Sequence, residues 1–217
     1  NKLDYFFMSN AKNPRTTNVI GQTPEVQSVY GTSTISFKDY LYLDITARND
    51  WSSALPKANQ SYFYPSVGLT AIITDMLDMP SWISYGKLRT TYAKAGFGGQ
   101  QYLTDNYFSV GAGGAINTPS VRSLGNYQPE ITTSYEAGLD WRFFTNRIGL
   151  DVTYYKSDTR NQLIALAVPN ATLFSSQYIN AGLIRNTGVE VLLSGAPVRN
   201  KNFSWDMMVN FSKNVNK

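Results

Sequence analysis

The chain has 217 residues, of which 42% are apolar and 14% aromatic, and its net charge is +4. It contains neither histidine nor cysteine, which excludes disulfides, thiolate or imidazole catalysis, and zinc sites built from these ligands. No apolar run reaches the roughly 18 residues of a membrane-spanning helix, and the scattered basic residues do not indicate nucleic-acid binding. We therefore expect no enzymatic activity, no metal and no cofactor.

Residues 1–25 predict an irregular segment, and beyond it short stretches alternate polar and apolar residues. In 135–143, odd positions carry Tyr, Ala, Leu, Trp and Phe, whereas even positions carry Glu, Gly, Asp and Arg. A period of two places these sets on opposite faces of a β-strand. The pattern predicts an all-β protein with strands near 26–37, 40–52, 61–74, 84–96, 131–143, 147–162, 177–195 and 203–214.

The predicted connections alternate between short and long. Lys38-Asp39, 75–83, Thr145-Asn146 and 197–202 fall at one end of the sheet, and 53–60, 97–130 and 163–176 fall at the other. Outer-membrane barrels have short periplasmic turns and longer extracellular loops. The alternation therefore favours an antiparallel transmembrane β-barrel over a soluble meander.

The two faces of the predicted strands differ sharply in charge. The apolar face is free of charge for about 25 Å from the short-turn end, as the lipid-facing band of a barrel must be. The other face predicts a wet lumen, whose wall contacts water, a plug or cargo. Its charged residues are Asp44, Arg48, Lys87, Arg89, Glu136, Asp140, Arg142, Asp151, Glu190 and Asp206. Asp140 and Asp151 are a conceivable carboxylate pair for glycoside hydrolysis, although a barrel wall is an unusual place for one.

The first charges on the apolar face are all cations, Lys94, Lys156, Arg185 and Lys213. Each lies about nine or ten residues from the short-turn end, where the apolar band should stop. They predict an outer-leaflet cation belt that either reaches toward water or binds phosphates of lipopolysaccharide.

Loop 97–130 is the best functional candidate, because loops of more than about 15 residues usually carry function or are disordered. Its aromatic residues Tyr102, Tyr107 and Phe108 offer flat apolar faces. In one interpretation they stack on sugar rings or pack against a partner protein, and in the other they fold onto the barrel rim.

Several segments resemble the barrel of SusC/RagA-type TonB-linked outer-membrane transporters of the Bacteroidetes. The resemblance spans about 30–217 and is carried by Leu43–Ser53, Tyr62–Gly68, Tyr85–Tyr92, Pro129–Asp140 and Asn180–Glu190, in that order. It implies a barrel of about 22 strands, of which this chain supplies about eight interior ones. Alone, such a segment would expose two unpaired edges.

The resemblance also implies partners and a function. A plug and a TonB box, expected outside this sequence, would couple the barrel to TonB, and a SusD-like lipoprotein would cap its mouth. The cargo would be glycan fragments or oligopeptides, and two transporter–lipoprotein pairs would form a dimer. Two alternatives stay open: a passive porin or small complete outer-membrane barrel, and a soluble glycan-binding β-sandwich.

Overall fold

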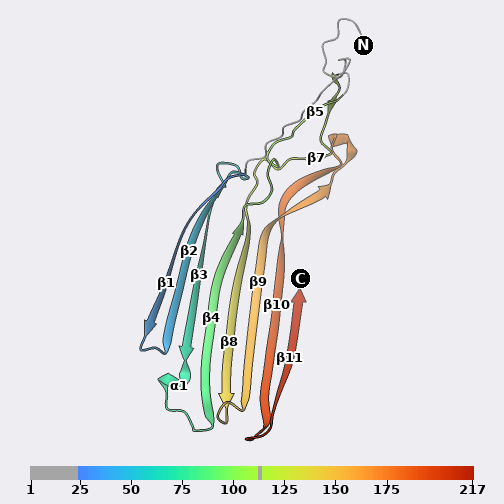
Figure 1. Ribbon diagram of the computed structural model, residues 1–217. Coiled ribbons are helices and arrows are strands. Elements are labelled where there is room, and N and C mark those ends of the chain that lie inside the picture. Colours follow the sequence, from blue (N-terminus) through green and yellow to red (C-terminus); the bar gives the residue numbers. More distant parts are fainter. Residues whose placement is uncertain (1–23, 112–113) are drawn as a thin grey trace, which may run out of the picture.

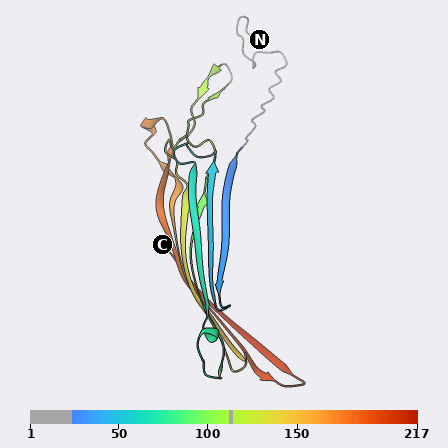
Figure 2. The ribbon, with the colours of Figure 1, turned by 90° about the vertical axis from the view of Figure 1, so that its left-hand side faces the viewer.

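The computed structural model describes residues 24–111 and 114–217, so the predicted irregular segment 1–25 lies almost wholly outside the described residues. These residues form one curved layer of long strands, seen face-on in Figure 1 and from its side in Figure 2. Within this part of the chain, no second layer covers either face. This is the architecture of a barrel wall and not of a sandwich.

Eight long antiparallel strands make the wall, in the order β1-β2-β3-β4-β8-β9-β10-β11. Their bounds are β1 Val26–Phe37, β2 Leu41–Ser52, β3 Ser61–Ile72, β4 Ile83–Phe97, β8 Glu130–Phe143, β9 Ile148–Ala167, β10 Ser176–Arg199 and β11 Ser204–Asn216. The short strands β5 (Ser109–Val110) and β6 (Ile116–Asn117) form a separate hairpin, and β7 (Val121–Arg122) pairs in parallel with β10.

Two strands run four or five residues further than the alternating pattern predicts. Strand β9 continues to Ala167 and not 162, and β10 continues to Arg199 and not 195. The sequence suggests an end at Pro197, but the β10–β11 ladder shifts register between Gly195 and Val198 and then continues. A bulge of this kind accommodates proline, which cannot donate to the ladder.

The connections segregate by end, as predicted. The β1–β2, β3–β4, β8–β9 and β10–β11 connections lie at the lower end in Figure 1, and the others lie at the upper end. Lys38 and Asp39 both have positive φ (49° and 55°), as a type I′ hairpin turn requires. The β3–β4 connection spans 73–82, longer than 53–60 above, so the alternation in length is not strict. It contains α1 (Ile73–Met76), and no helix among the described residues is long and apolar enough to cross a membrane.

The register aligns the two faces across the whole wall. Residues paired in adjacent strands share a face, so rows of paired residues cross all eight strands. One row is apolar throughout: Phe37, Leu41, Ala71, Leu88, Leu139, Val152, Val191 and Phe211. The neighbouring row, one residue along each strand, is Ser36, Tyr42, Thr70, Arg89, Gly138, Thr153, Glu190 and Ser212. We call these sides the apolar face and the polar face.

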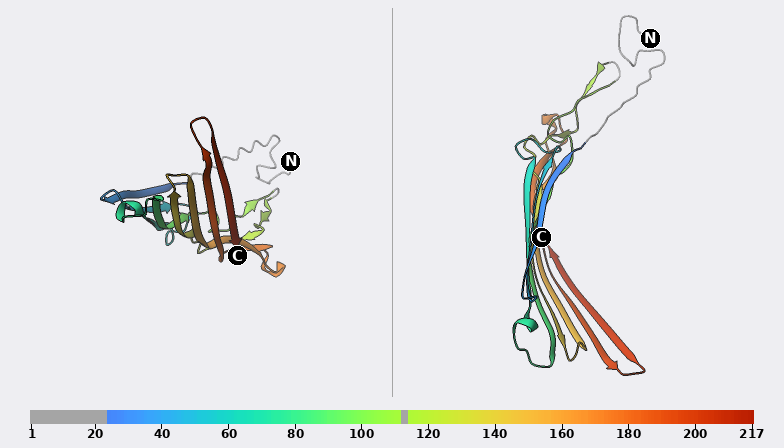
Figure 3. Two further views of the ribbon diagram at one scale, coloured as in Figure 1. Left: turned by 90° about the horizontal axis from the view of Figure 1, so that it is seen from below. Right: turned by 60° about the vertical axis from the view of Figure 1, so that its left-hand side comes forward.

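The wall is open, with β1 and β11 as its edges (Figure 3). Every residue of both strands is exposed, because each strand has a neighbour on one side only. A long unpaired edge is a template for pairing with another strand, so native proteins pair, cover or interrupt such edges. Closure of a barrel requires further strands beyond both edges.

Strands β9 and β10 bend together toward the long-loop end. Asn161 and Gly182 both have left-handed backbone, with φ of 59° and 88°, and the ladder omits both between Gln162–Ala181 and Arg160–Leu183. Asn161 is one of the residue types that tolerate this region, and glycine adopts it without steric cost. The kink turns the ends of β9 and β10 away from the wall (Figure 1).

Candidate functional site

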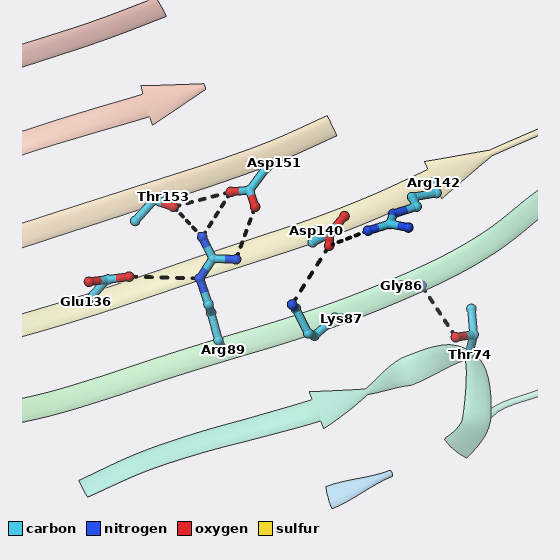
Figure 4. Close-up of polar contacts among 9 residues, drawn as sticks. All are labelled: Thr74, Gly86, Lys87, Arg89, Glu136, Asp140, Arg142, Asp151 and Thr153. Carbon is cyan, nitrogen blue, oxygen red and sulfur yellow. Dashed lines mark hydrogen bonds and ion pairs between the residues drawn. The ribbon is translucent and has the colours of Figure 1, made fainter. Parts of the chain in front are cut away.

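The polar face carries a cluster of charges across β4, β8 and β9, drawn in Figure 4. Arg89 donates from Nη2 to Asp151 Oδ1 at 2.9 Å and from Nη1 to Oδ2 at 3.2 Å, so the contact is bidentate. The same Nη2 donates to Thr153 Oγ1 at 2.6 Å, and Glu136 Oε1 lies 3.8 Å from Arg89 Nε. Bidentate contact fixes the orientation of both partners as well as attracting them.

Gly138 allows Arg89 to reach across β8. It stands opposite Arg89 in one ladder and opposite Thr153 in the other, so the guanidinium passes directly over it. A Cβ atom at this position would lie 2.6 Å from Arg89 Nε. Any side chain at 138 would therefore push the guanidinium away from Asp151. The alternating pattern places Gly138 on the polar face but gives no sign of this role.

A second group of charges adjoins the first. Lys87 Nζ lies 3.8 Å from Asp140 Oδ2, and Arg142 Nη2 donates weakly to the same oxygen at 3.5 Å. Arg142 also lies over the ring of Tyr85, with its Cζ 5.2 Å from the centroid. Across the two groups, three cations balance three carboxylates. Asp140 and Asp151 are directly opposed in the β8–β9 ladder. Lys87 contacts Asp140 and Arg89 contacts Asp151, so both carboxylates are engaged in ion pairs within the wall and do not form an acid–base pair.

The other predicted luminal residues lie elsewhere on this face. Asp44, on β2, accepts a hydrogen bond from Thr34 Oγ1 at 2.7 Å and is two strands away from β4. Glu190 shares a row with Arg89 but is separated from it by Gly138 and Thr153. Arg48 lies toward the long loops. The sequence thus predicts a shared face, whereas the structure shows which charges touch.

We expect the substitution Asp151→Asn to lower the free energy of unfolding of the full-length protein by about 1–2 kcal/mol. Arg89 would lose its charged acceptor, while partial hydration of the site limits the loss. The measurement is the temperature at which the folded barrel converts to its slower-migrating form on a detergent gel. Glu190→Gln removes a carboxylate from the same face, in the row of Arg89 but not in contact with it, and should leave that temperature unchanged. Equal shifts would contradict the assigned role of Asp151.

Polar side chains are buried where the strands meet the long loops. Asp50 is only 4% exposed and accepts from Arg48 Nε at 2.8 Å and from the Tyr64 hydroxyl. Arg48 Nη2 also donates to Ser28 Oγ at 3.1 Å. A buried carboxylate is tolerated only when its oxygens are paired in this way. This group therefore fixes the upper ends of β1, β2 and β3.

The 53–60 and 98–129 connections pack together above this group. Leu55, Tyr62 and Tyr127 form a buried cluster, with Tyr127 only 3% exposed. The Tyr127 hydroxyl accepts from the Gln100 backbone N–H at 3.1 Å, and Asn59 Nδ2 donates to the Tyr127 carbonyl at 2.9 Å. Burial raises the pKa of Tyr127, which keeps its hydroxyl neutral. The base of the long loop is thus folded onto the rim.

The predicted contact residues lie beyond this anchored base. Tyr102, Tyr107 and Phe108 are each about half exposed, and the first two rings meet edge to face with centroids 5.5 Å apart. Further out, the β5–β6 hairpin exposes Val110 and Ile116. The base of the loop is therefore packed on the rim, whereas the three predicted contact residues are exposed and not part of that packed cluster.

A cavity of about 300 Å³ opens between the loop base and the strands. It combines an exposed aromatic ring, amide side chains and a carboxylate, which together can stack on, donate to and accept from a polar ligand. Its lining residues are Phe97, Gln100, Tyr127, Glu130, Asn161, Gln162 and Leu163. We call it the mouth cavity. Four of these residues lie within the predicted functional loop 97–130, but the sequence pattern singles out none of the seven, because residues 97–100 and 127–130 are separated by the whole loop.

Asn180 holds one side of the mouth cavity in place. Its side chain donates to the Gln128 and Asn161 carbonyls at 3.1 and 2.8 Å, and accepts from the Gln128 N–H at 2.8 Å. These three bonds tie the end of the long loop to the kink in β9.

The predicted cation belt contains a carboxylate as well. Arg185 donates from Nε and Nη2 to Asp158 at 2.6 and 3.0 Å, and Lys156 Nζ lies 3.8 Å from the same side chain. Lys94 and Arg185 fall in one row, Lys156 falls one row closer to the short turns on this face, and Lys213 two rows closer. The cations share an end of the apolar face, and one of them is neutralised by Asp158.

Residues 2–216 match the family model described as TonB dependent receptor-like, beta-barrel. The TonB-dependent receptor P26 of Formosa agariphila is 29% identical over 206 residues, and the TonB-dependent receptor SusC of Bacteroides thetaiotaomicron is 26% identical over 217 residues. These matches cover 89% and 88% of this chain but 20% of each relative. The chain thus spans about a fifth of the length of these relatives.

Solved structures agree with this assignment. The RagAB peptide importer in its closed-closed state matches with a TM-score of 0.77 and 26% identity, over 88% of this chain and 22% of that one. A mutant ferric enterobactin receptor (PfeA) of Pseudomonas aeruginosa shares the fold, with a TM-score of 0.60, 15% identity, and coverage of 88% and 27%. The family is one of receptors and transporters and not of enzymes. The chain belongs to the TonB-dependent receptor-like β-barrel family and forms part of the wall of a SusC/RagA-type barrel in the outer membrane.

Proposed function

We propose that this chain forms part of the wall of an energy-coupled importer of oligopeptides or oligosaccharides. The observation that carries the proposal is the charged, self-compensating polar face, set in a wall that matches the RagAB peptide importer at a TM-score of 0.77. In such an importer the polar face lines the lumen, and the apolar face contacts lipid. TonB acts through a plug carried by another part of the protein.

Cargo meets the wall first at the mouth cavity. Phe97 and Glu130 lie on the luminal face, at the end of the β4–β8 ladder, so the cavity faces the entrance of the lumen. An aromatic ring, a carboxylate and amides suit peptide backbones and sugar hydroxyls alike. Because RagAB is a peptide importer, peptides are the first cargo to test.

A SusD-like lipoprotein covers the mouth in this proposal. The exposed loop tip, with Tyr107, Phe108, Val110 and Ile116, extends past the packed base of the loop. Apolar groups gathered at an exposed tip typically mark a contact surface. The matches to SusC and to RagAB support a partner of this class.

The test is uptake by cells that express the full-length protein. We expect labelled oligopeptides or oligosaccharides to enter only when TonB is present; uptake that continues without TonB would favour a passive porin. Glu130→Ala combined with Gln100→Ala should weaken cargo binding at least about thirtyfold, by loss of one charged and one neutral hydrogen bond that together contribute about 2 kcal/mol or more. Asp105→Asn, in the same loop but outside the mouth cavity, is the control and should bind cargo as the parent does.

A further inference from the structure

A groove runs over the lipid-facing side of β3, β4, β8 and β9. Two hollows of about 510 and 360 Å³ share Leu69, Thr90, Ala137 and Tyr154, so they form one depression. These four residues follow one another in a single row, in which small Thr90 and Ala137 stand between larger neighbours. The groove exists because two adjacent strands carry small residues at the same height.

Positive charges gather where the groove ends toward the long loops. Tyr92 and Tyr135 close that end, with ring centroids 5.1 Å apart. Lys156 pairs with Tyr135 in the β8–β9 ladder, and Lys94 lies two residues beyond Tyr92 on the same face. Two lysines therefore flank the end of an apolar groove.

Asp158 neutralises Arg185 more than it neutralises the lysines. It holds Arg185 in a bidentate contact at 2.6 and 3.0 Å, whereas Lys156 Nζ lies 3.8 Å away and is held less tightly. Arg160 lies on the same face, in the next row toward the long loops. Four cations, Lys94, Lys156, Arg160 and Arg185, against one carboxylate leave a net charge of +3 in a surface that faces lipid.

We propose that the groove and its lysines bind the lipid A part of one lipopolysaccharide molecule, with an acyl chain along Thr90 and Ala137 and a phosphate at Lys94 and Lys156. Lysine is a common point-charge partner for phosphate. A groove gives no hydrophobic gain inside a bilayer, since lipid tails are as apolar as the protein surface. The groove therefore contributes shape complementarity to one acyl chain, and the lysines contribute the preference for a phosphorylated head group.

The position along the strands selects the lipid. The lysines lie at the long-loop end, which is the extracellular end of an outer-membrane barrel. The leaflet there is built of lipopolysaccharide, whose lipid A carries phosphate groups above several acyl chains. A phospholipid of the inner leaflet would place its phosphate at the opposite end of the groove.

The test uses the full-length protein, purified in detergent and stripped of lipid. Binding of purified lipid A and of phosphatidylglycerol is measured in mixed micelles for the parent and for Lys94→Gln combined with Lys156→Gln. Removing both lysines should weaken lipid A binding about thirtyfold, by loss of two charges near a phosphate surface. Lys38→Gln combined with Lys201→Gln removes the same charge from the opposite end of the wall and should leave lipid A binding unchanged.

Filling the groove is the second arm. Ala137→Phe should also weaken lipid A binding, whereas Val191→Phe, on the same face but outside the groove, should not. The gel shift of the folded barrel confirms that each variant folds, and the lysine variants carry the test if Ala137→Phe fails to fold. Equal affinity for lipid A and phosphatidylglycerol, or unchanged lipid A binding in the folded lysine or Ala137→Phe variant, overturns the proposal.

Discussion

The substitution Val191→Arg is expected to destabilise the full-length barrel by about 2–4 kcal/mol, whereas Leu192→Arg, one residue further on, is expected to cost much less. Val191 belongs to the row that is apolar in all eight strands. It lies midway along β10 between Arg185, in the outer cationic region, and Val198, which pairs with Trp205 at the short-turn end. An arginine at this depth would sit near the middle of the hydrocarbon layer.

Leu192 is a matched control because it differs from Val191 in little but its face. It pairs with Asp151 on one side and Asn210 on the other, both on the polar face. An arginine at 192 would therefore enter the lumen beside a carboxylate. The pair of variants changes the same strand by the same side chain and separates lipid exposure from any general effect of arginine in a strand.

The measurement is the midpoint of unfolding in urea, in lipid vesicles, for the parent and both variants. A loss confined to Val191→Arg assigns the apolar face to lipid. Equal losses in the two variants would mean that the face assignment is wrong, and a loss confined to Leu192→Arg would invert it.

The division into two faces could be predicted because it depends only on alternation along each strand. Val191 and Glu190 fall on opposite faces whatever the neighbouring strands do. The all-β barrel fold class was predicted from this alternation together with the position of the connections. The antiparallel sheet and the match to a β-barrel family model confirm that fold class. The alternation persists in every long strand because one face must stay apolar against lipid and the other must stay wet.

The contacts within each face could not be predicted, because they depend on register. Arg89 meets Asp151 across an intervening strand, and only the pairing of all three strands places Gly138 beneath the guanidinium. The role of Asp158 within the cation belt was not predicted for a different reason. Asp158 lies on the same face as Lys156 but closer to the long loops, outside the apolar band from which the prediction was made. Its partner Arg185 is identified only by the β9–β10 ladder.

The folded base of the long loop was also beyond the sequence pattern. Asn59 reaches Tyr127 from the other upper connection, and Gly99 lies under the same tyrosine. Loop residues follow no regular period, so contacts between two loops depend on individual side-chain packing and hydrogen bonds. The sequence signal that could have indicated this packing is the glycine at position 99. Glycine is the residue that adopts a positive φ without steric cost, and the structure gives Gly99 a φ of +73°.

The substitution Gly99→Val is expected to release loop 98–129 from the rim. A Cβ at this position would lie 1.5 Å from the Tyr127 hydroxyl oxygen, so the buried ring cannot keep its place in the cluster of Leu55, Tyr62 and Tyr127. A β-branched residue with positive φ adds about 1–3 kcal/mol of backbone strain. Together these costs exceed what the Tyr127 cluster gains by staying packed.

The release is measured by tryptic cleavage after Arg122, which lies within the loop in β7. If the free energy of local opening falls by about 3 kcal/mol, cleavage should accelerate roughly 100-fold, because proteolysis follows the population of the open form. Gly125→Val places the same side chain in the same loop where a Cβ meets nothing within 4 Å, and cleavage there should match the parent. The barrel itself should keep its gel shift in both variants, because the strand ladders do not include Gly99.

Since Tyr127 also lines the mouth cavity, Gly99→Val should reduce cargo binding as well. Unchanged cleavage in Gly99→Val would show that the loop is held by contacts other than the Tyr127 cluster.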